Sequence, residues 1–206
     1  MMQNKTVLVV DDEPNILEPV GAYLEKQGYK VLTAERGQDA LELVKRGGID
    51  IVLLDLMLPD ISGEDICRKI RQTSRLPIIM LTAKVAESSQ IEGLQIGADD
   101  YITKPFSLKV LAARVEAVLR RLPESQPPEL FADKQLTATE RSIVNALSRR
   151  PSRIFTRNEL ISVAFGDGFD GYDRVIDTHI KNLRKKIGSD IIKTVHGLGY
   201  KWGGME

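Results

Sequence analysis

The chain has 206 residues, equal numbers of acidic and basic side chains, and one cysteine. This length allows one large or two small domains, and the lone Cys67 excludes an intrachain disulfide framework. No apolar run reaches the roughly 20 residues that span a bilayer, and no signal peptide is recognisable. We therefore expect a cytoplasmic protein with no membrane partner.

The charge is divided unevenly along the chain. Residues 1–135 hold 17 Lys and Arg against 21 Asp and Glu, whereas residues 136–206 hold 12 against 8. An acidic part joined to a basic part indicates two separate tasks, the second of which suits an anionic partner.

Short apolar runs alternate with segments of helical periodicity over residues 1–121. The expected strands are 6–10, 29–34, 49–55, 76–81 and 100–103, and the expected helices lie near 14–27, 37–46, 63–72, 87–96 and 107–121. The runs are rich in Val, Ile and Leu on both faces, as in strands that helices cover on both sides. This pattern predicts a doubly wound α/β domain with a five-stranded parallel sheet.

Polar side chains stand where the expected strands end. Asp11 and Asp12 follow the first strand, Asp55 ends the third, Thr82 follows the fourth and Lys104 follows the fifth. Each alone suits the start of the next helix, but ligands of open α/β sheets bind beyond the carboxyl ends of the strands. Clustered carboxylates suit Mg²⁺, and a lysine suits a phosphate oxygen. Together they predict a site where a carboxylate accepts a phosphoryl group.

The segments "VVDDE", "LLDLMLPDISG", "MLTA" and "GADDYITKPF" resemble, in order and spacing, the receiver domain of bacterial response regulators, a flavodoxin-like fold, over residues 5–121. The resemblance implies that Asp55 is the phosphoacceptor and that a sensor histidine kinase is the donor. It also implies that Asp12, Asp55 and the Met57 carbonyl bind Mg²⁺ directly, with Asp11 acting through water.

The same resemblance assigns roles to the remaining polar residues. Lys104 would contact the phosphoryl group and form a cis peptide with Pro105. Thr82 and Tyr101 match the switch pair of the family, in which the threonine moves onto a phosphate oxygen and the aromatic ring turns inward. Met57 and Lys84 match positions that tune the lifetime of the phosphoryl group.

The second half has a different pattern. The segments "TATERSIVNALSRR" and "TRNELISVAFG" each open with a threonine followed closely by glutamate, which is typical of a capped helix. A third helix, "DRVIDTHIKNLRKKIG", precedes two apolar arms around a glycine-containing turn. Three helices and a hairpin predict a small winged helix-turn-helix domain over residues 136–206, after a Pro-rich linker over 122–135.

The third helix has an apolar stripe and, on another face, polar residues at helical spacing. These polar residues are Arg174, Thr178, Lys181, Asn182 and Lys185, and the hairpin adds Lys193, Thr194, His196 and Lys201. A solvated charged face is the simpler explanation of such a cluster. The adjoining hairpin favours double-stranded DNA as the partner, with the helix in the major groove.

"RVIDTHIKNLRKKIG" with "IIKTVHGLGYKW" resembles the effector domain of the OmpR/PhoB subfamily. Carried over by position, the DNA-facing helix residues are Arg174, His179, Lys181, Asn182 and Arg184, and the wing residues are Thr194 and His196. The resemblance also implies a homodimer, through the receiver face that contains Asp100 and Arg114. It further implies a small sheet before the effector helices, but the linker is too short to form that sheet. We expect Leu130 and Phe131 to cover the helical surface that the sheet would otherwise protect. The alternative is that two chains associate through this uncovered surface.

The leading interpretation is a transcription regulator that phosphorylation controls through promoter DNA binding, and not an enzyme. Two alternatives stay open. The receiver could mainly pass phosphoryl groups on, with a weak or atypical DNA-binding output. An aspartyl-phosphate hydrolase of the haloacid-dehalogenase type is disfavoured because Met57 stands where that family places a second aspartate.

Overall fold

The computed structural model describes residues 5–82, 96–120, 131, 134–166, 169 and 174–204. The chain forms two compact units, Met1–Leu119 and Arg120–Glu206, and each is described by itself. Among the described residues, no helix is long and apolar enough to cross a membrane.

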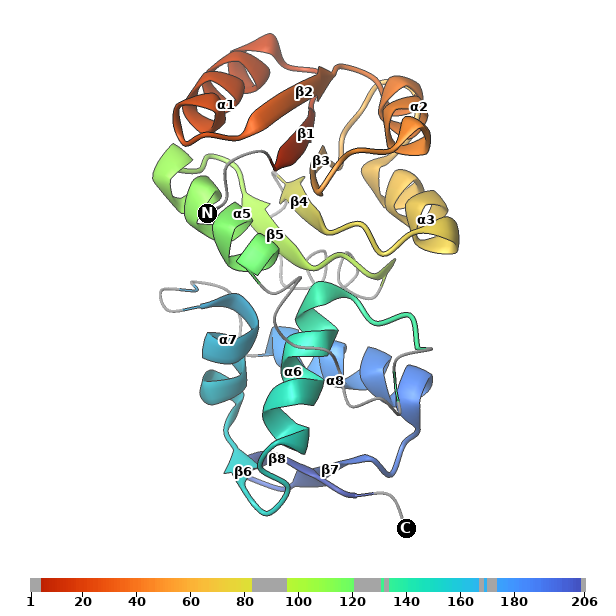
Figure 1. Cartoon of the computed structure of the whole chain (residues 1–206), viewed down its shortest axis with the longest axis vertical. Coiled ribbons are helices and arrows are strands. Elements are labelled where there is room, and N and C mark those ends of the chain that lie inside the picture. The colour runs from red at the N-terminus through yellow and green to blue at the C-terminus, as the bar shows by residue number, and fades with distance from the viewer. Residues whose placement is uncertain are drawn as a thin grey trace. The chain divides into compact units, whose positions relative to one another are not determined.

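The first unit is a parallel sheet covered by helices, as the sequence predicted. Its strands β1 (Thr6–Val10), β2 (Lys30–Ala34), β3 (Ile51–Asp55), β4 (Ile78–Thr82) and β5 (Asp100–Thr103) follow the order β2-β1-β3-β4-β5. Figure 1 shows α1 (Pro14–Lys26) and α5 (Leu108–Arg120) on one face, and α2 (Gly37–Arg46) and α3 (Gly63–Thr73) on the other. Strands β1, β3 and β4 are buried along their whole length, which explains their continuous apolar sequence. Most of the helix expected near 87–96 lies outside the described residues.

Gly63 lets α3 begin directly against the end of β3. Its backbone N–H donates to the carbonyl of Leu56 over 3.0 Å. A Cβ at this position would lie 2.2 Å from the carbonyl oxygen of Asp55 and 2.8 Å from the Cα of Leu56. Both neighbours are backbone atoms that cannot move aside, so the turn after Asp55 requires glycine here.

The loop between Asp55 and α3 is tied to a second helix by Asp60. Its carboxylate accepts hydrogen bonds from the backbone N–H groups of Gln38 (3.0 Å) and Gly37 (2.8 Å), at the N-terminus of α2. These bonds hold the pKa of Asp60 below its ordinary value. A carboxylate is favourable here because the first N–H groups of a helix have no intrahelical partner.

The second unit contains three helices and a small antiparallel sheet. The helices are α6 (Ala138–Ser148), α7 (Arg157–Phe165) and α8 (Arg174–Ile187), and the strands β6 (Ile154–Phe155), β7 (Ile192–Val195) and β8 (Gly199–Trp202) follow the order β6-β8-β7. Thr137 with Glu140 and Thr156 with Glu159 form the two capping boxes that the sequence predicted. The winged-helix prediction is confirmed, and β6 is an addition that the sequence did not indicate.

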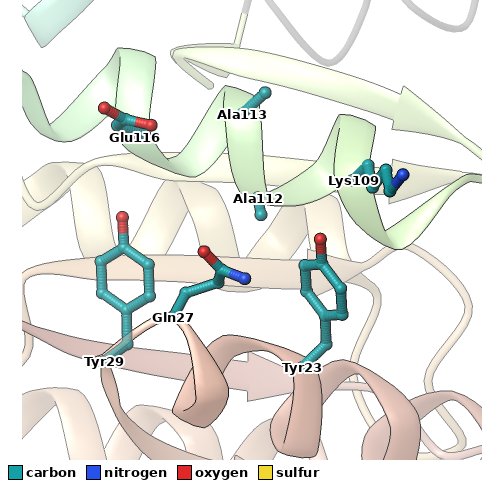
Figure 2. A pocket seen from close by; sticks show the side chains of 7 residues that line it. All are labelled: Tyr23, Gln27, Tyr29, Lys109, Ala112, Ala113 and Glu116. Carbon is teal, nitrogen blue, oxygen red and sulfur yellow. The ribbon is translucent and has the colours of Figure 1, made fainter.

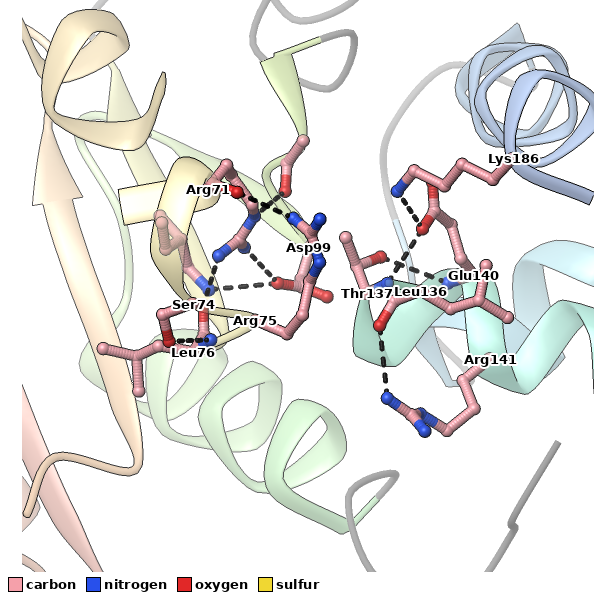
Figure 3. A network of polar contacts seen from close by, with 12 residues as sticks. Arg71, Ser74, Arg75, Leu76, Asp99, Leu136, Thr137, Glu140, Arg141 and Lys186 are labelled. Carbon is pink, nitrogen blue, oxygen red and sulfur yellow. Dashed lines mark hydrogen bonds and ion pairs between the residues drawn. The ribbon is translucent and has the colours of Figure 1, made fainter. Parts of the chain in front are cut away.

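A buried ion pair locks the start of β4 to α3 (Figure 3). The Arg71 guanidinium donates to Asp99 Oδ2 (2.9 Å) and to the carbonyls of Gly97 (2.8 Å) and Leu76 (2.6 Å). The side chains of Arg71 and Asp99 are only 7% and 0% exposed. Asp99 Oδ2 also accepts the backbone N–H of Ile78, so the pair joins α3, β4 and the segment before β5.

We expect Arg71→Met to lower the free energy of unfolding of the first unit by about 3–5 kcal/mol, because removal of one partner deprives a buried charge of its counterion. Urea denaturation of the purified protein measures this loss. Arg68→Met is the matched control on the same helix, since the ion pair of Arg68 with Asp65 is 56% exposed on both sides and should matter much less. Equal losses in the two variants would contradict the assigned role of the buried pair.

Candidate functional sites

Three carboxylates meet at the carboxyl ends of β1 and β3. Asp11, Asp12 and Asp55 each offer an oxygen within 4.8 Å of the others. The two strands are direct neighbours in the sheet, with Val10 opposite Leu54, so the residues that follow them are brought together by the pairing register. Asp11 and Asp55 are buried and Asp12 is exposed, which leaves the cluster open on one side.

Lys104 reaches this cluster from the end of β5. Its ammonium lies 2.7 Å from Asp11 Oδ2, 3.1 Å from Asp55 Oδ2 and 3.5 Å from Glu13 Oε1. The backbone N–H of Lys104 donates to the carbonyl of Thr82 over 2.7 Å, which fixes its position beside β4. The peptide bond between Lys104 and Pro105 is cis.

Each buried carboxylate is oriented through both of its oxygens. Asp11 Oδ1 accepts the backbone N–H of Glu13 (3.1 Å) and Asp55 Oδ1 accepts that of Leu56 (2.8 Å). The two Oδ2 atoms share the Lys104 ammonium. The carboxylates are therefore held in place by the backbone on one side and by a single cation on the other.

The environment changes the proton affinities of these groups. Burial raises the pKa of Asp55 above its ordinary value, although the hydrogen bond and charge of Lys104 pull it down. Burial alone would lower the pKa of Lys104, but hydrogen bonds and charges from Asp11 and Asp55 outweigh this and raise it. The lysine is thus a permanent cation beside the carboxylates.

The donor set fits a magnesium ion. Carboxylate and carbonyl oxygens are the ligands that this hard cation takes, and it usually keeps several waters. Met57 lies next to the cluster, since its backbone hydrogen bond is among the groups that lower the pKa of Asp55, and its side chain is 65% exposed. The residues that could hold the ion are Asp11, Asp12, Asp55 and the Met57 carbonyl.

The two residues of the expected switch lie on neighbouring strands. Thr82 ends β4 and Tyr101 is the second residue of β5, with Met80 opposite Tyr101 in the register. Both side chains are buried, so the tyrosine ring is already turned inward. Lys84 lies outside the described residues.

Asp100 and Arg114, expected at a dimer face, bind each other within one chain. The Arg114 guanidinium donates to both carboxylate oxygens of Asp100, over 3.1 and 3.0 Å. Both side chains are buried.

The expected DNA-facing residues fall into three groups. Exposed are Arg174, Lys181, Lys185, Thr194 and His196, whereas Thr178, His179 and Asn182 are buried and Arg184 is half-buried. The His179 ring centroid lies 5.6 Å from that of Phe165 on α7, so this side chain packs inside the unit. The burial of these three residues does not favour the DNA contact predicted for them.

Sequence reasoning missed three residues that connect α8 with its neighbours: Arg157, Asp177 and Tyr200. For Asp177, the seven-residue spacing from Arg184 on one face of α8 was the available signal.

A polar hollow of about 360 Å³ lies elsewhere on the first unit, between α1 and α5 (Figure 2). Tyr23, Gln27 and Tyr29 line one side of it, and α5 lines the other side with Lys109, Ala112, Ala113 and Glu116. Burial, followed by the charge of Glu116, raises the pKa of Tyr29. None of the three clustered aspartates lines this hollow.

Both halves of the chain match known protein families. Residues 7–116 match the response regulator receiver domain, and residues 132–202 match the family described as transcriptional regulatory protein, C terminal. The sensory transduction protein RegX3 of Mycobacterium tuberculosis H37Rv is 37% identical over 225 residues, which cover 97% of this chain and 99% of that protein. The alkaline phosphatase synthesis transcriptional regulatory protein PhoP of Bacillus subtilis is 38% identical over 231 residues, 96% of each chain. Both alignments are longer than the 206 residues of this chain, so these relatives contain residues without a counterpart here.

Solved structures are also similar to this chain over nearly its whole length. The response regulator DrrB of Thermotoga maritima, an OmpR/PhoB homolog, is 34% identical, with a TM-score of 0.57 over 99% of this chain and 100% of that chain. A mutant of RitR is 25% identical, with a TM-score of 0.76 over 96% of this chain and 98% of that chain. The chain therefore belongs to the OmpR/PhoB-type response regulators, the two-component transcription regulators that join a receiver domain to a C-terminal DNA-binding domain.

Proposed function

We propose that Asp55 accepts a phosphoryl group from a sensor histidine kinase and that this modification controls binding of the C-terminal domain to promoter DNA. The observation that carries the proposal is the single Lys104 ammonium shared by Asp55 and Asp11 at the carboxyl ends of the strands. This arrangement supplies a nucleophilic carboxylate and a fixed cation at one point.

In the transfer step, an Asp55 oxygen forms a bond to phosphorus while the bond from phosphorus to the imidazole nitrogen of the kinase breaks. The leaving imidazole keeps the electron pair of that bond. The Leu56 N–H holds the other Asp55 oxygen at 2.8 Å, and the Lys104 ammonium attracts the phosphoryl oxygens. Magnesium held by Asp11, Asp12, Asp55 and the Met57 carbonyl would neutralise negative charge on those oxygens.

The switch follows from the charge that the phosphoryl group adds, about −1.5 to −2. A change from about 1% to 99% active state needs roughly 5.5 kcal/mol of differential stabilisation. We assign the response to the Thr82 hydroxyl on β4 and the Tyr101 ring on the adjacent β5. The pairing of β4 with β5, which places the two residues on adjacent strands, supports this assignment.

The proposed domain boundaries are 1–121 for the receiver, 122–135 for the linker and 136–206 for the DNA-binding domain. Of the two linker residues expected to fold back, Phe131 is buried and its ring meets that of Trp202 edge-on, with centroids 6.0 Å apart. Leu130 lies outside the described residues. This ring contact joins the linker to β8, and the cover of the helical surface stays a prediction.

For DNA binding, we assign phosphate and groove contacts to the exposed residues of α8 and the wing. Arg174, Lys181 and Lys185 recur along α8 at helical spacing and are exposed. Thr194 and His196 are exposed on the hairpin. Double-stranded promoter DNA is the partner that this basic surface suits.

Homodimerisation through the face of Asp100 and Arg114 would exchange their intrachain ion pair for one between two chains. Because one ion pair replaces another, the free energy gained on dimerisation would depend on the packing around the new pair.

Asp55→Asn is expected to abolish phosphoryl uptake from acetyl phosphate in the presence of Mg²⁺, because the amide has no nucleophilic carboxylate oxygen. Intact-protein mass spectrometry detects the added phosphoryl group. Asp39→Asn is the matched control, since Asp39 is an exposed aspartate on α2. Uptake by Asp55→Asn at the wild-type rate would exclude Asp55 as the acceptor.

Lys104→Met is expected to slow phosphorylation by about 100-fold or more, because one preorganised cation at the reacting oxygens is lost. Mg²⁺ affinity, measured by calorimetry, should not fall, since the lysine competes with the metal for Asp11 and Asp55. Lys109→Met on α5, where the lysine is exposed, provides the control. A variant that loses Mg²⁺ binding together with phosphorylation would contradict this division of roles.

Lys181→Ala is expected to reduce the slope of log affinity for DNA against log salt by about one contact, because one phosphate-bound cation is lost. Fluorescence anisotropy with a labelled duplex measures the slope. Lys30→Ala, at an exposed lysine of the receiver unit, should leave the slope at its wild-type value. An unchanged slope for Lys181→Ala would rule out a phosphate contact at this position.

A further inference from the structure

Two charged residues of α8 bind the two long strands of the wing. Asp177 and Arg184 are seven residues apart, which is about two helical turns, so they project from the same side of α8. Asp177 bonds to β8 and Arg184 bonds to β7. Helix α8, the recognition helix of the proposed DNA contact, therefore holds both arms of the hairpin through side chains.

Asp177 joins three elements at one carboxylate. Its Oδ1 accepts the Tyr200 hydroxyl of β8 over 2.7 Å. The same oxygen accepts Arg157 Nε from the first turn of α7 over 2.8 Å, and Oδ2 accepts a second Arg157 N–H over 3.3 Å. The hydroxyl and the forked guanidinium together fix the orientation of the carboxylate.

Arg184 directs its guanidinium at the wing. Its Nε and one terminal nitrogen both donate to the carbonyl of Ile192, over 3.0 and 2.6 Å. The same terminal nitrogen donates to the Thr194 hydroxyl over 2.8 Å. The guanidinium carbon also lies 5.8 Å from the centroid of the Tyr200 ring, within the range of a cation–π contact.

We propose that Asp177, Arg184 and Tyr200 form a strut that sets the position of the wing against the recognition helix. Arg184 is then a positioning residue that seats the hairpin, although its place on the helix had suggested a DNA contact. This inference rests on the proposed DNA-binding function, because the strut matters by presenting the wing at a fixed distance from α8.

Three properties suit these residues to that task. Tyr200 is buried, and burial, followed by its bond to Asp177, raises its pKa to about 12, so the hydroxyl remains a donor at physiological pH. His196 and Leu198 at the wing tip are exposed, so the tip has few contacts of its own to hold it. A binding element held in place before association loses less conformational entropy when it binds.

The test compares full-length wild type with Arg184→Lys, Tyr200→Phe and the double variant. A short fluorescein-labelled duplex of mixed sequence is titrated at several salt concentrations. Lysine keeps the charge but lacks the forked geometry, and phenylalanine removes only a hydroxyl group. If the strut seats the wing, each single variant weakens binding roughly tenfold and flattens the salt slope by about one contact. The double variant should then bind DNA with the same affinity as the single variant that binds less tightly, because both changes release the same hairpin.

Lys185→Ala is the matched control, since Lys185 is the exposed neighbour of Arg184 on α8. Its effect on affinity should add to that of Tyr200→Phe, because a phosphate contact and the strut are independent. Wild-type affinity and slope in Arg184→Lys would mean that this position acts only through its charge, and would overturn the proposal. Wild-type affinity in Tyr200→Phe, or an additive double variant, would overturn it as well.

Amide hydrogen exchange without DNA separates this inference from the proposed function. The backbone amides of Lys193, Thr194 and Val195 are expected to exchange faster in both single variants than in wild type, while unfolding midpoints report on the fold as a whole. If wild type does not bind DNA, the proposed function fails, and the exchange rates alone decide on the strut. Unchanged exchange would refute it.

Discussion

The receiver site depends on one electrostatic constraint: two buried carboxylates, Asp11 and Asp55, share a single ammonium group. Two buried negative charges this close together repel each other, and the ammonium group of Lys104, which follows β5, compensates this repulsion. The parallel sheet makes this possible because β1, β3 and β5 all end at the same edge. Gly63 then allows α3 to start directly against that edge, where any other residue would displace the backbone of Asp55.

Different contacts hold the two ends of β4 and β5. Their starts are fixed by the buried Arg71–Asp99 pair, which also binds the backbone of Ile78. Their other ends carry Thr82 and Lys104, the residues proposed to respond to the phosphoryl group. In the proposed switch, a change at Asp55 would act on the carboxyl ends of these strands, whereas the Arg71–Asp99 pair holds their starts.

Sequence patterns predicted those features that depend on periodicity or on the edge of a parallel sheet. Strands apolar on both faces and the carboxylates that follow them needed no knowledge of distant contacts. The Arg71–Asp99 pair was not predictable, because its partners are 28 residues apart and either residue reads as a surface charge. The two-residue strand β6 is too short to show alternation. On α8, spacing identified which residues share a face but not what covers it, so the packing of His179 against Phe165 was missed. Arg184 shows the same limit, since a basic residue on a recognition helix can bind either DNA or the wing.

Strand β8 connects the recognition helix with the linker. Tyr200 and Trp202 are two residues apart and so lie on the same side of the strand; the first bonds to Asp177 and the second meets the ring of Phe131. An aromatic pair of this kind contributes about 0.5–1.5 kcal/mol beyond the area it buries, which is comparable to a single hydrogen bond of the strut. Both contacts fall on one short strand of four residues, so β8 joins α8 and the linker. The contact of Phe131 with Trp202 therefore attaches the linker directly to a strand of the hairpin.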